Sequence, residues 1–253
     1  MKKKYDIIIG NGCSFTQGGG LNNPLIYKFL TGKEEEGNAG EIYMKENSYP
    51  KFLSELLDCE YMNTSESCSS NNFILERAYK LLKELKEKGN LLIINQLSYA
   101  SRFGFATGDK YYSYNNLDGK LVYDYKNNEH KNGKFTKIDS SSPFDQYYKK
   151  YILEVFDAEY YWECISMQMD LFNSWCEKRN IDNYWVSWDE YNRISHIDRV
   201  IDCEGEHAAA WATNNELLLS HIPNIPQHDL HLSIEGHKNL TNIIFDRIKL
   251  DNK

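Results

Sequence analysis

The chain has 253 residues, 41% of them hydrophobic, and a formal net charge of −8. This length suits one large domain with a substantial core, and because no linker or repeat divides the chain we expect a single domain over residues 1–253. The acidic balance argues against a nucleic-acid-binding function, since such surfaces carry a concentrated basic patch and the only basic cluster here is the opening MKKK.

Hydropathy and cysteine spacing set the expected compartment. No run of about 18 apolar residues occurs, and the apolar stretch near the start is too short for the core of a signal peptide. Six cysteines lie scattered, without the short paired spacings of a zinc site or the density of a disulfide scaffold. We therefore expect a cytoplasmic protein with reduced thiols that does not bind membranes.

The first third of the sequence alternates between strand and helix patterns. YDIII at residues 5–9 predicts a buried strand, and the glycine-, asparagine- and charge-rich residues 17–46 predict a surface loop. A helix is expected over 48–59, where Pro50 stands near its start and apolar residues recur at helical spacing. A short strand over 60–65 follows.

The next segments continue this alternation. Residues 70–90 predict an amphipathic helix closed by Gly89, and LLIINQLS at 91–98 predicts a third buried strand. Alternating strands and helices favour right-handed crossovers and a mainly parallel sheet, in which ligands gather at the carboxyl ends of the strands. We therefore expect an α/β protein with its site at that edge.

The second half begins with an insertion, which we place at about 103–148. Its segment 110–125 alternates around Asp118-Gly119 and predicts a β-hairpin followed by a polar loop. A helix is expected from about 150 to 178, a fourth strand at NYWVSW (183–188) and a last helix from roughly 234 to 250.

Three residues suggest nucleophilic catalysis. Ser14 follows the first strand among glycines in IIIGNGCSFTQGGG, and Asp229 and His231 precede the last helix in HDLHLSIEGH. Together they supply the serine, histidine and acid that make a weak hydroxyl nucleophilic, provided that both segments meet at one sheet edge. Residues two apart in an extended segment point the same way, so a direct bond between Asp229 and His231 requires the loop to curl.

The segments GCSFT, NTSESCSSNNFI, LLIINQLSYASR and HDLHLSIEGH, in this order, resemble the blocks of the SGNH or GDSL-type hydrolase superfamily. The resemblance implies a flavodoxin-like three-layer α/β/α sandwich and serine ester hydrolysis without a cofactor. It implies Ser14 as the nucleophile and Asp229 with His231 as its partners. An O-acyl ester, such as an O-acetyl group on a carbohydrate, is the implied substrate.

The chain departs from the family pattern at the oxyanion hole, whose donors in the family come from the second and third blocks. The glycine of the second block is replaced by Cys68 or Ser69, of which only a backbone N–H is required. The third block lacks its Gly-x-Asn, which leaves the side-chain donor open among a set of polar residues: Asn71, Asn95, Gln96 and Ser98. Cys13 replaces the usual acid before the nucleophile, and His228 occupies the usual place of the acid before the histidine.

Other readings of these residues stay open. Ser14 could cap a turn or face a phosphate, and the aromatic insertion could belong to a non-catalytic module that binds a glycan or a protein. A metal-dependent hydrolase could use the acid and histidines of one short stretch as ligands, namely His221, His228, Asp229, His231 and His237. Their spacing matches no strong motif, so we expect no metal. The sequence does not predict the oligomeric state.

Overall fold

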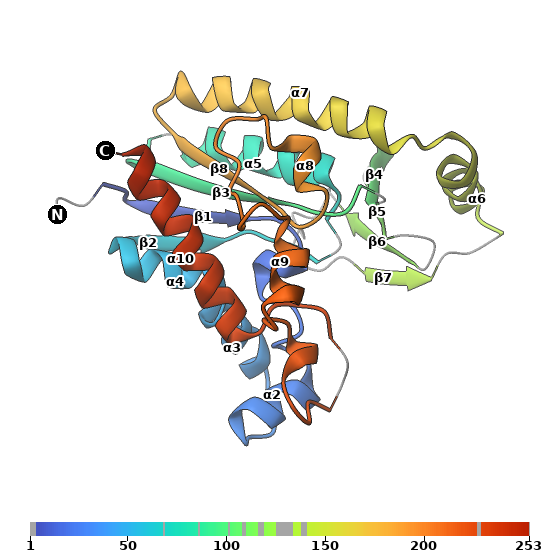
Figure 1. The fold of residues 1–253 in the computed structure, drawn as a ribbon. Helices are drawn as coiled ribbons and strands as arrows, with labels where there is room; N and C mark the ends of the chain where they lie inside the picture. The colour runs from blue at the N-terminus through green and yellow to red at the C-terminus, as the bar shows by residue number, and fades with distance from the viewer. Residues whose placement is uncertain are drawn as a thin grey trace.

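We describe the protein from a computed structural model, which covers residues 4–252 apart from 68, 86, 101, 108–109, 116–118, 125–133, 138–140 and 227–228. Its centre is a parallel sheet with the strand order β2-β1-β3-β8 (Figure 1). The strands are β1 (Ile7–Asn11), β2 (Glu60–Asn63), β3 (Leu91–Leu97) and β8 (Asp182–Ser187). The predicted α/β class is confirmed, and this order is the one found in flavodoxin-like folds.

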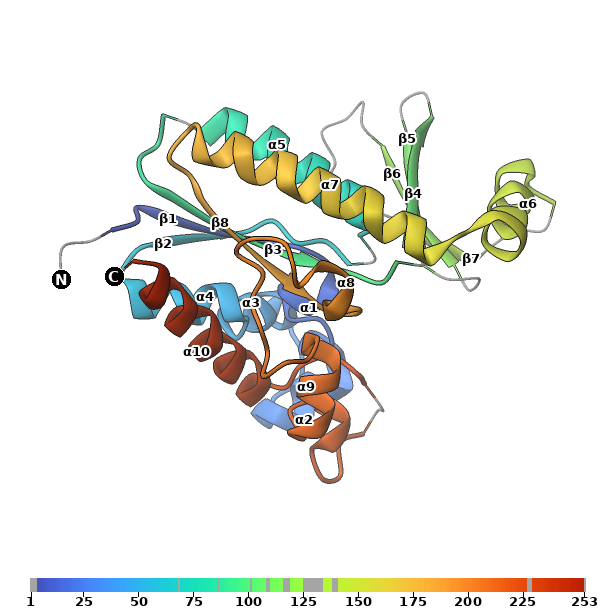
Figure 2. The ribbon, with the colours of Figure 1, turned by 45° about the horizontal axis from the view of Figure 1, so that its top comes forward.

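Helices cover both faces of this sheet (Figure 2). On one face lie α5 (Asn71–Leu85) and α7 (Ala158–Glu177), and on the other lie α4 (Tyr49–Leu57) and α10 (Ile234–Asp251). Because successive strand residues point to opposite faces, the side chains of the buried strands pack into two separate hydrophobic cores, one on each face of the sheet. Ile8 and Ile94 belong to the core under α4 and α10, whereas Ile9 and Ile93 belong to the core under α5 and α7. The expected three-layer sandwich is confirmed.

The predicted loop over 17–46 is wrong, because two helices lie within it. These are α2 (Pro24–Thr31) and α3 (Ala39–Glu46). The side chain of Asn23 accepts hydrogen bonds from the first backbone N–H groups of α2, and Pro24 occupies the first helical position. This start signal was present in the sequence, but the surrounding glycines and charges concealed it.

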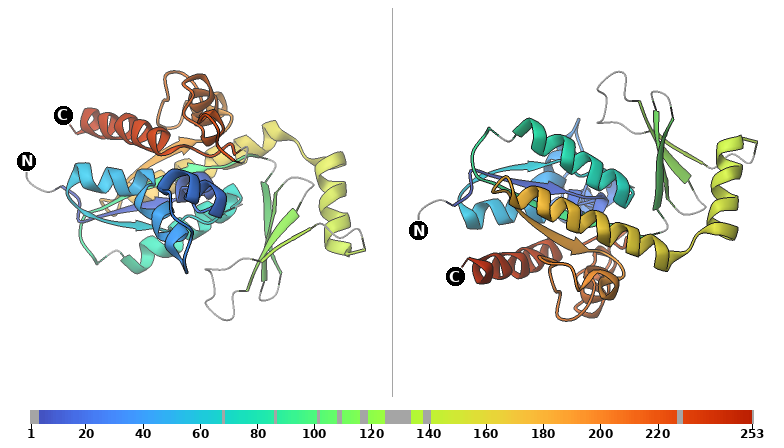
Figure 3. Two further views of the ribbon diagram at one scale, coloured as in Figure 1. Left: turned by 90° about the horizontal axis from the view of Figure 1, so that it is seen from below. Right: turned by 90° about the horizontal axis from the view of Figure 1, so that it is seen from above.

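A second, antiparallel sheet with the order β4-β5-β6-β7 lies beyond the carboxyl ends of the parallel strands (Figure 3). Its strands are β4 (Arg102–Thr107), β5 (Lys110–Asn115), β6 (Gly119–Asp124) and β7 (Lys134–Lys137). The predicted hairpin is confirmed as the β5–β6 pair. Its turn, with Asp118, and the side chains of its tyrosines lie outside the described residues, so the idea that they hold a glycan stays a prediction.

The long helix predicted from 150 to 178 is wrong in its first part. Helix α6 (Pro143–Lys150) continues into one π-helical turn, Tyr151–Val155, and the chain then leaves helical geometry at Phe156. Asp157 caps α7, since its side chain accepts from the N–H of Tyr160. The break was hidden because the residues 151–156, YILEVF, are mostly apolar and lead into α7. Helix α6 itself lies in the segment that we predicted as a polar loop, so that part of the prediction is wrong. Helix α6 stands on the far side of the second sheet (Figure 3).

The chain after β8 forms short elements that lead back to the sheet edge. These are α8 (Tyr191–Ile194), α9 (Ala208–Asn214) and a 3₁₀ turn at Leu219–His221. Between α8 and α9, Val200 forms one parallel bridge to Trp185, which extends the sheet beyond β8. Among the described residues no helix is long and apolar enough to cross a membrane. The five cysteines that the structure describes are free thiols.

Candidate active site

The nucleophile candidate stands at the carboxyl end of β1. Ser14 is the first residue of the short helix α1 (Ser14–Gln17), and Cys13 precedes it as the N-cap. The carbonyl of Cys13 accepts hydrogen bonds from the N–H groups of Thr16 and Gln17, which turns the chain sharply after the strand. Ser14 itself is 7% exposed, so its hydroxyl lies in a largely dry setting that solvent still reaches. As the first helical residue, it has a backbone N–H with no acceptor among the described residues.

The loop before α10 carries the acid and the histidine, and it curls as the sequence required. The backbone carbonyls of Asp229 and His231 accept hydrogen bonds from Ser220 and Leu219, both at 2.8 Å. Oδ1 of Asp229 also accepts from the backbone N–H of His231 at 2.8 Å, which closes an Asx turn. This turn brings the carboxylate back beside the imidazole of the residue two positions later.

Ser14, His231 and Asp229 form one connected chain of hydrogen bonds. Nε2 of His231 lies 2.8 Å from Oγ of Ser14, and Nδ1 of the same ring lies 2.7 Å from Oδ1 of Asp229. A carboxylate can only accept, so Nδ1 carries the proton of the neutral ring and the lone pair of Nε2 faces the serine hydroxyl. The arrangement can therefore take a proton from Ser14 while the carboxylate stabilises the imidazolium that forms.

Two glycines permit this close packing. A Cβ atom added to Gly19 would lie 2.8 Å from Nε2 of His231, and one added to Gly20 would lie 2.8 Å from Oδ2 of Asp229. Gly20 also has a positive φ of 83°, a conformation that side chains disfavour. Any larger residue here would displace the imidazole or the carboxylate. Gly19 and Gly20 are thus parts of the site, and the sequence analysis noted glycines around Ser14 without predicting this close packing.

An aromatic wall backs the imidazole. The Phe15 ring centroid lies 4.7 Å from that of His231 and stacks on Trp188 at 3.7 Å. Nε1 of Trp188 donates to the hydroxyl of Tyr99 at 3.0 Å, and Tyr99 meets Phe15 edge to face. Phe15 and Trp188 are both nearly fully buried, so the wall restricts the rotation of the imidazole. Sequence reasoning missed Phe15 and Trp188, since single aromatics in a chain rich in tyrosine carry no distinctive signal.

The described residues that we expected to supply oxyanion donors are engaged in hydrogen bonds to neighbouring groups. Cys68 lies outside the described residues, and the backbone N–H of Ser69 donates to Glu66 O at 3.3 Å. The Asn71 amide forms two hydrogen bonds with the backbone of Ser98, at 3.1 Å to its carbonyl and 2.6 Å from its N–H. This pair joins the start of α5 to the end of β3. Ser69, Asn71 and Ser98 are fully buried.

The remaining polar candidates lie on β3 with their side chains on opposite faces. Asn95 accepts from Asn11 of β1 at 2.7 Å on the side of α5. Gln96 accepts from the hydroxyl of Thr16, which places its side chain beneath α1. The amide nitrogens of both residues and the Ser98 hydroxyl have no partner among the described residues. Buried donors without a partner therefore lie on and just after β3, but within the described residues none of them is hydrogen-bonded to Ser14.

The second histidine of the motif has a different environment. His237 lies within α10, is fully buried, and accepts from the backbone N–H of Tyr49 through Nδ1 at 3.3 Å. Burial lowers the pKa of His237 to about 3, and the nearby His231 contributes in the same direction. His237 is therefore neutral and structural at neutral pH.

The possible metal ligands do not gather in the described part of the chain. Within it, no three histidine, cysteine, aspartate or glutamate side chains lie close enough together to hold an ion. His221 contacts the backbone N–H of Leu218, His237 is buried in α10, and His228 lies outside the described residues. Asp229 and His231 are engaged with each other and with Ser14.

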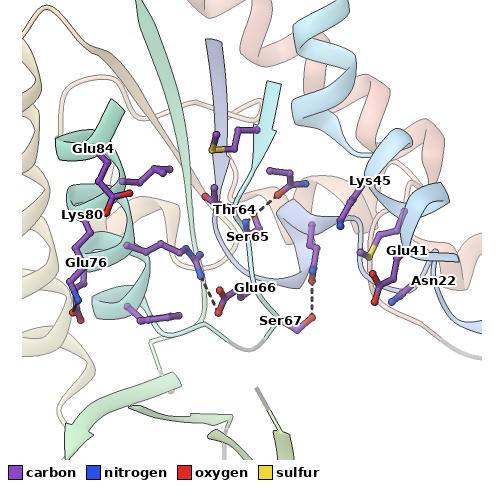
Figure 4. A pocket seen from close by; sticks show the side chains of 17 residues that line it. Asn22, Glu41, Lys45, Thr64, Ser65, Glu66, Ser67, Glu76, Lys80 and Glu84 are labelled. Atoms are coloured by element: carbon purple, nitrogen blue, oxygen red, sulfur yellow. Dashed lines mark hydrogen bonds and ion pairs between the residues drawn. The ribbon is translucent and has the colours of Figure 1, made fainter. Parts of the chain in front are cut away.

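A cavity of about 980 Å³ lies beside the site, between α3 and α5 along the free edge of β2 (Figure 4). Glu66 and Ser67 stand in its middle, with Glu41 and Lys45 on one side and Lys80 and Glu84 on the other. Gln17 lines it and accepts from the hydroxyl of Ser67 at 3.0 Å, whereas Ser14, Asp229 and His231 do not line it. The cavity thus adjoins the loop after β2 rather than the serine itself.

Comparison with known proteins gives similarity in three-dimensional structure only. No protein-family model matches the sequence, and no curated protein matches it. Solved structures align over 96% to 98% of the chain at low identity. A Desulfitobacterium hafniense protein described as belonging to the lipolytic G-D-S-L family is 16% identical, with a TM-score of 0.43 and 98% of its length covered.

Two other similar structures are esterases. The psychrotrophic esterase EstA from Pseudoalteromonas sp. is 12% identical, with a TM-score of 0.44 and 97% of its length covered. An acetyl xylan esterase from the rumen bacterium Butyrivibrio proteoclasticus is 14% identical, with a TM-score of 0.46 and 65% of its length covered. Each of these similarities concerns overall architecture.

Proposed function

We propose that the protein is a serine hydrolase that cleaves carboxylic esters, with Ser14 as the nucleophile. The observation that carries the proposal is the unbroken hydrogen-bonded series from Ser14 Oγ through His231 to Asp229, with separations of 2.8 and 2.7 Å. This series depends on two glycines, an Asx turn and a largely buried carboxylate. A turn serine or a helix-capping serine would require none of these features.

The proposed reaction begins with attack of Ser14 Oγ on the ester carbonyl. His231 takes the hydroxyl proton through Nε2, while Asp229 holds the ring and stabilises the positive charge. The proton then passes from Nε2 to the departing alcohol oxygen as the tetrahedral intermediate collapses to an acyl-enzyme. A water molecule, activated by the same imidazole, attacks the acyl-enzyme and releases the acid, and Ser14 regains its proton.

The negative charge of the tetrahedral intermediate needs donors near Ser14. The backbone N–H of Ser14 supports the proposal because it is unbonded among the described residues and opens α1. We propose the backbone of Cys68 or Ser69, on the loop after β2, as the source of a second donor. Asn71, Gln96 and Ser98 remain the candidates for a side-chain donor.

Within this class we propose O-acyl esters, including O-acetyl groups of carbohydrates, as the substrates. This choice of substrate rests on the resemblance of the four sequence blocks to SGNH hydrolases, and not on an individual residue. A series of p-nitrophenyl esters with acyl chains of increasing length, tested alongside acetylated sugars, separates short-chain from long-chain preference.

The variant Ser14→Ala tests the proposal. It removes one buried oxygen, so the protein should fold normally while kcat for p-nitrophenyl acetate falls by at least about a thousandfold. Ser195→Ala is a matched control, because Ser195 is exposed and its hydroxyl donates to the carbonyl of Asn192, its one hydrogen bond among the described residues. Unchanged turnover in Ser14→Ala would refute the serine mechanism. Loss of wild-type activity in EDTA, restored by zinc, would instead favour a metal-dependent hydrolase.

A further inference from the structure

Arg77 reaches from α5 to the end of β1 and to the loop after β2. Its Nη2 donates to the carbonyl of Gly12 at 2.6 Å, and its Nε donates to Oδ1 of Asn11 at 2.7 Å. Its Nη1 donates to the hydroxyl of Ser69 at 3.2 Å. One side chain thus holds the two residues that end β1 and begin the turn to Ser14, and also a residue of the loop that should carry an oxyanion donor.

The groups that Arg77 contacts are themselves fixed. The amide of Asn11 donates to Asn95 at 2.7 Å and to the carbonyl of Ile74 at 2.9 Å. The carbonyl of Gly12 also accepts from the backbone N–H of Glu66 at 3.2 Å. Asn11 therefore connects the end of β1 to β3 and α5, the Gly12 carbonyl connects it to the loop after β2, and Arg77 contacts both residues.

The position suits arginine rather than lysine. The Arg77 side chain is only 12% exposed, and its charge is balanced by Glu66, whose Oε2 lies 3.7 Å from Nη1. Figure 4 shows Glu66 with its carboxylate turned toward α5 and a dashed line marking this ion pair. The guanidinium uses all three of its nitrogens on acceptors in different directions. A lysine ammonium carries the same charge but cannot span these acceptors.

We propose that Arg77 is a positioning residue, which holds Glu66 and Ser69 of the loop after β2 against the end of β1 and so sets the distance between the oxyanion donors and Ser14. This inference rests on the proposed ester hydrolysis for its consequence in catalysis. Its geometric part, the coupling of the two segments, does not depend on that function. Because Arg77 contacts neither Ser14 nor His231 in the described structure, it acts through the backbone.

The test compares Arg77→Ala and Arg77→Lys with Lys83→Ala. Lys83 is an exposed cation on the same helix, without a contact to either segment. In Arg77→Ala we expect kcat to fall on the order of a hundredfold with KM nearly unchanged, since small displacements of reacting groups have effects of this size. Arg77→Lys should recover little of the loss. Millimolar guanidinium chloride should partly restore kcat in Arg77→Ala alone, because it can occupy the vacated position.

Hydrogen–deuterium exchange gives a readout that is independent of activity. Backbone amides of residues 8–14 and 64–71 should exchange faster in both Arg77 variants, while the rest of the sheet and Lys83→Ala stay as in the wild type. Unchanged exchange, a uniform increase across the sheet, or an unaltered kcat in folded Arg77→Ala would overturn the proposal. If the wild type hydrolyses no ester, the proposed function fails and the exchange experiment still decides the coupling. If Arg77→Ala does not fold, Arg77→Lys serves in both measurements.

Discussion

The loop after β1 and the loops after β2 and β3 end at the same edge of the sheet, yet they use their polar side chains differently. In the first, Ser14 extends its hydroxyl to a histidine brought from residue 231, and glycines remove the side chains that would block the approach. In the others, Asn71 and Ser69 bond to nearby backbone and side-chain groups. Proton transfer needs side-chain atoms within hydrogen-bond reach of each other, whereas an oxyanion hole can be built from backbone held rigidly by such contacts.

We expect the largest effect on kcat from substitution of Asp229, the acid that contacts His231. Asp229→Asn should lower kcat about ten-thousandfold with little change in KM or stability, because a neutral amide allows the wrong imidazole tautomer and cannot stabilise the imidazolium. Steady-state kinetics with p-nitrophenyl acetate measure both constants. His228→Ala, at the position where the resemblance places the acid, should behave as the wild type. If the two variants lose activity equally, the triad reduces to a pair of Ser14 and His231.

Gly19 lies close to the imidazole of His231, and its substitution should cause a smaller loss of kcat. Gly19→Ala places a methyl group against Nε2 of His231 and should lower kcat on the order of a hundredfold. Gly32→Ala is the control, because Gly32 has a φ of 71° but open space around it, so that substitution adds backbone strain without touching the site. Equal kinetics in the two variants would mean that the imidazole moves aside freely.

For the loops after β2 and β3 we predict a loss of folding stability rather than of kcat. Asn71→Ala removes both hydrogen bonds to Ser98 in a buried setting and should lower the free energy of unfolding by about 2 to 4 kcal/mol. Its kcat should fall far less than that of Asp229→Asn. Urea denaturation and kinetics on the same preparation separate these effects. A collapse of kcat at unchanged stability would instead make Asn71 a direct donor to the oxyanion.

The smallest expected effect concerns His237 and is confined to acidic pH. The folded-state pKa of His237, about 3, lies below the ordinary histidine pKa of 6.5, so between these values the unfolded chain binds a proton that the folded chain does not. Stability therefore falls as the pH drops below 6.5, by up to about 1.4 kcal/mol per pH unit from this group. His237→Asn retains an acceptor for Tyr49 and should flatten the stability profile between pH 6 and 4.5. Identical slopes in both proteins would show that His237 titrates normally.

The parts of the fold that the sequence predicted are those with a strong local pattern. The buried runs at 7–9 and 91–97 are short, apolar and bounded by turn residues, as buried strands are, and α5 and α10 have apolar residues at helical spacing. Helices α2 and α3 were missed because each has only eight residues and stands among glycines, asparagines and charged residues. The break before α7 was missed because the residues that lead to it are mostly apolar. These features depend on capping contacts such as those of Asn23 and Asp157.

The residues of the candidate site also fall into those that the sequence predicted and those that it did not. Ser14, Asp229 and His231 could be named from sequence because their chemistry requires particular side chains next to a strand end or a helix start. The spacing of Asp229 and His231 left their contact open, and the Asx turn that joins them is a backbone feature. Arg77, Phe15 and Trp188 could not be named, since they contribute through contacts with residues distant in the chain.

The most direct test of the central claim is the reaction with a fluorophosphonate probe, followed by mass spectrometry of the modified peptide. A serine activated by His231 should form one covalent adduct, on Ser14, with the phosphorus in place of the hydroxyl hydrogen. The adduct should be absent from Ser14→Ala and should form far more slowly in His231→Ala. Stoichiometric labelling of a different residue, or no labelling of folded protein that hydrolyses esters, would contradict the account.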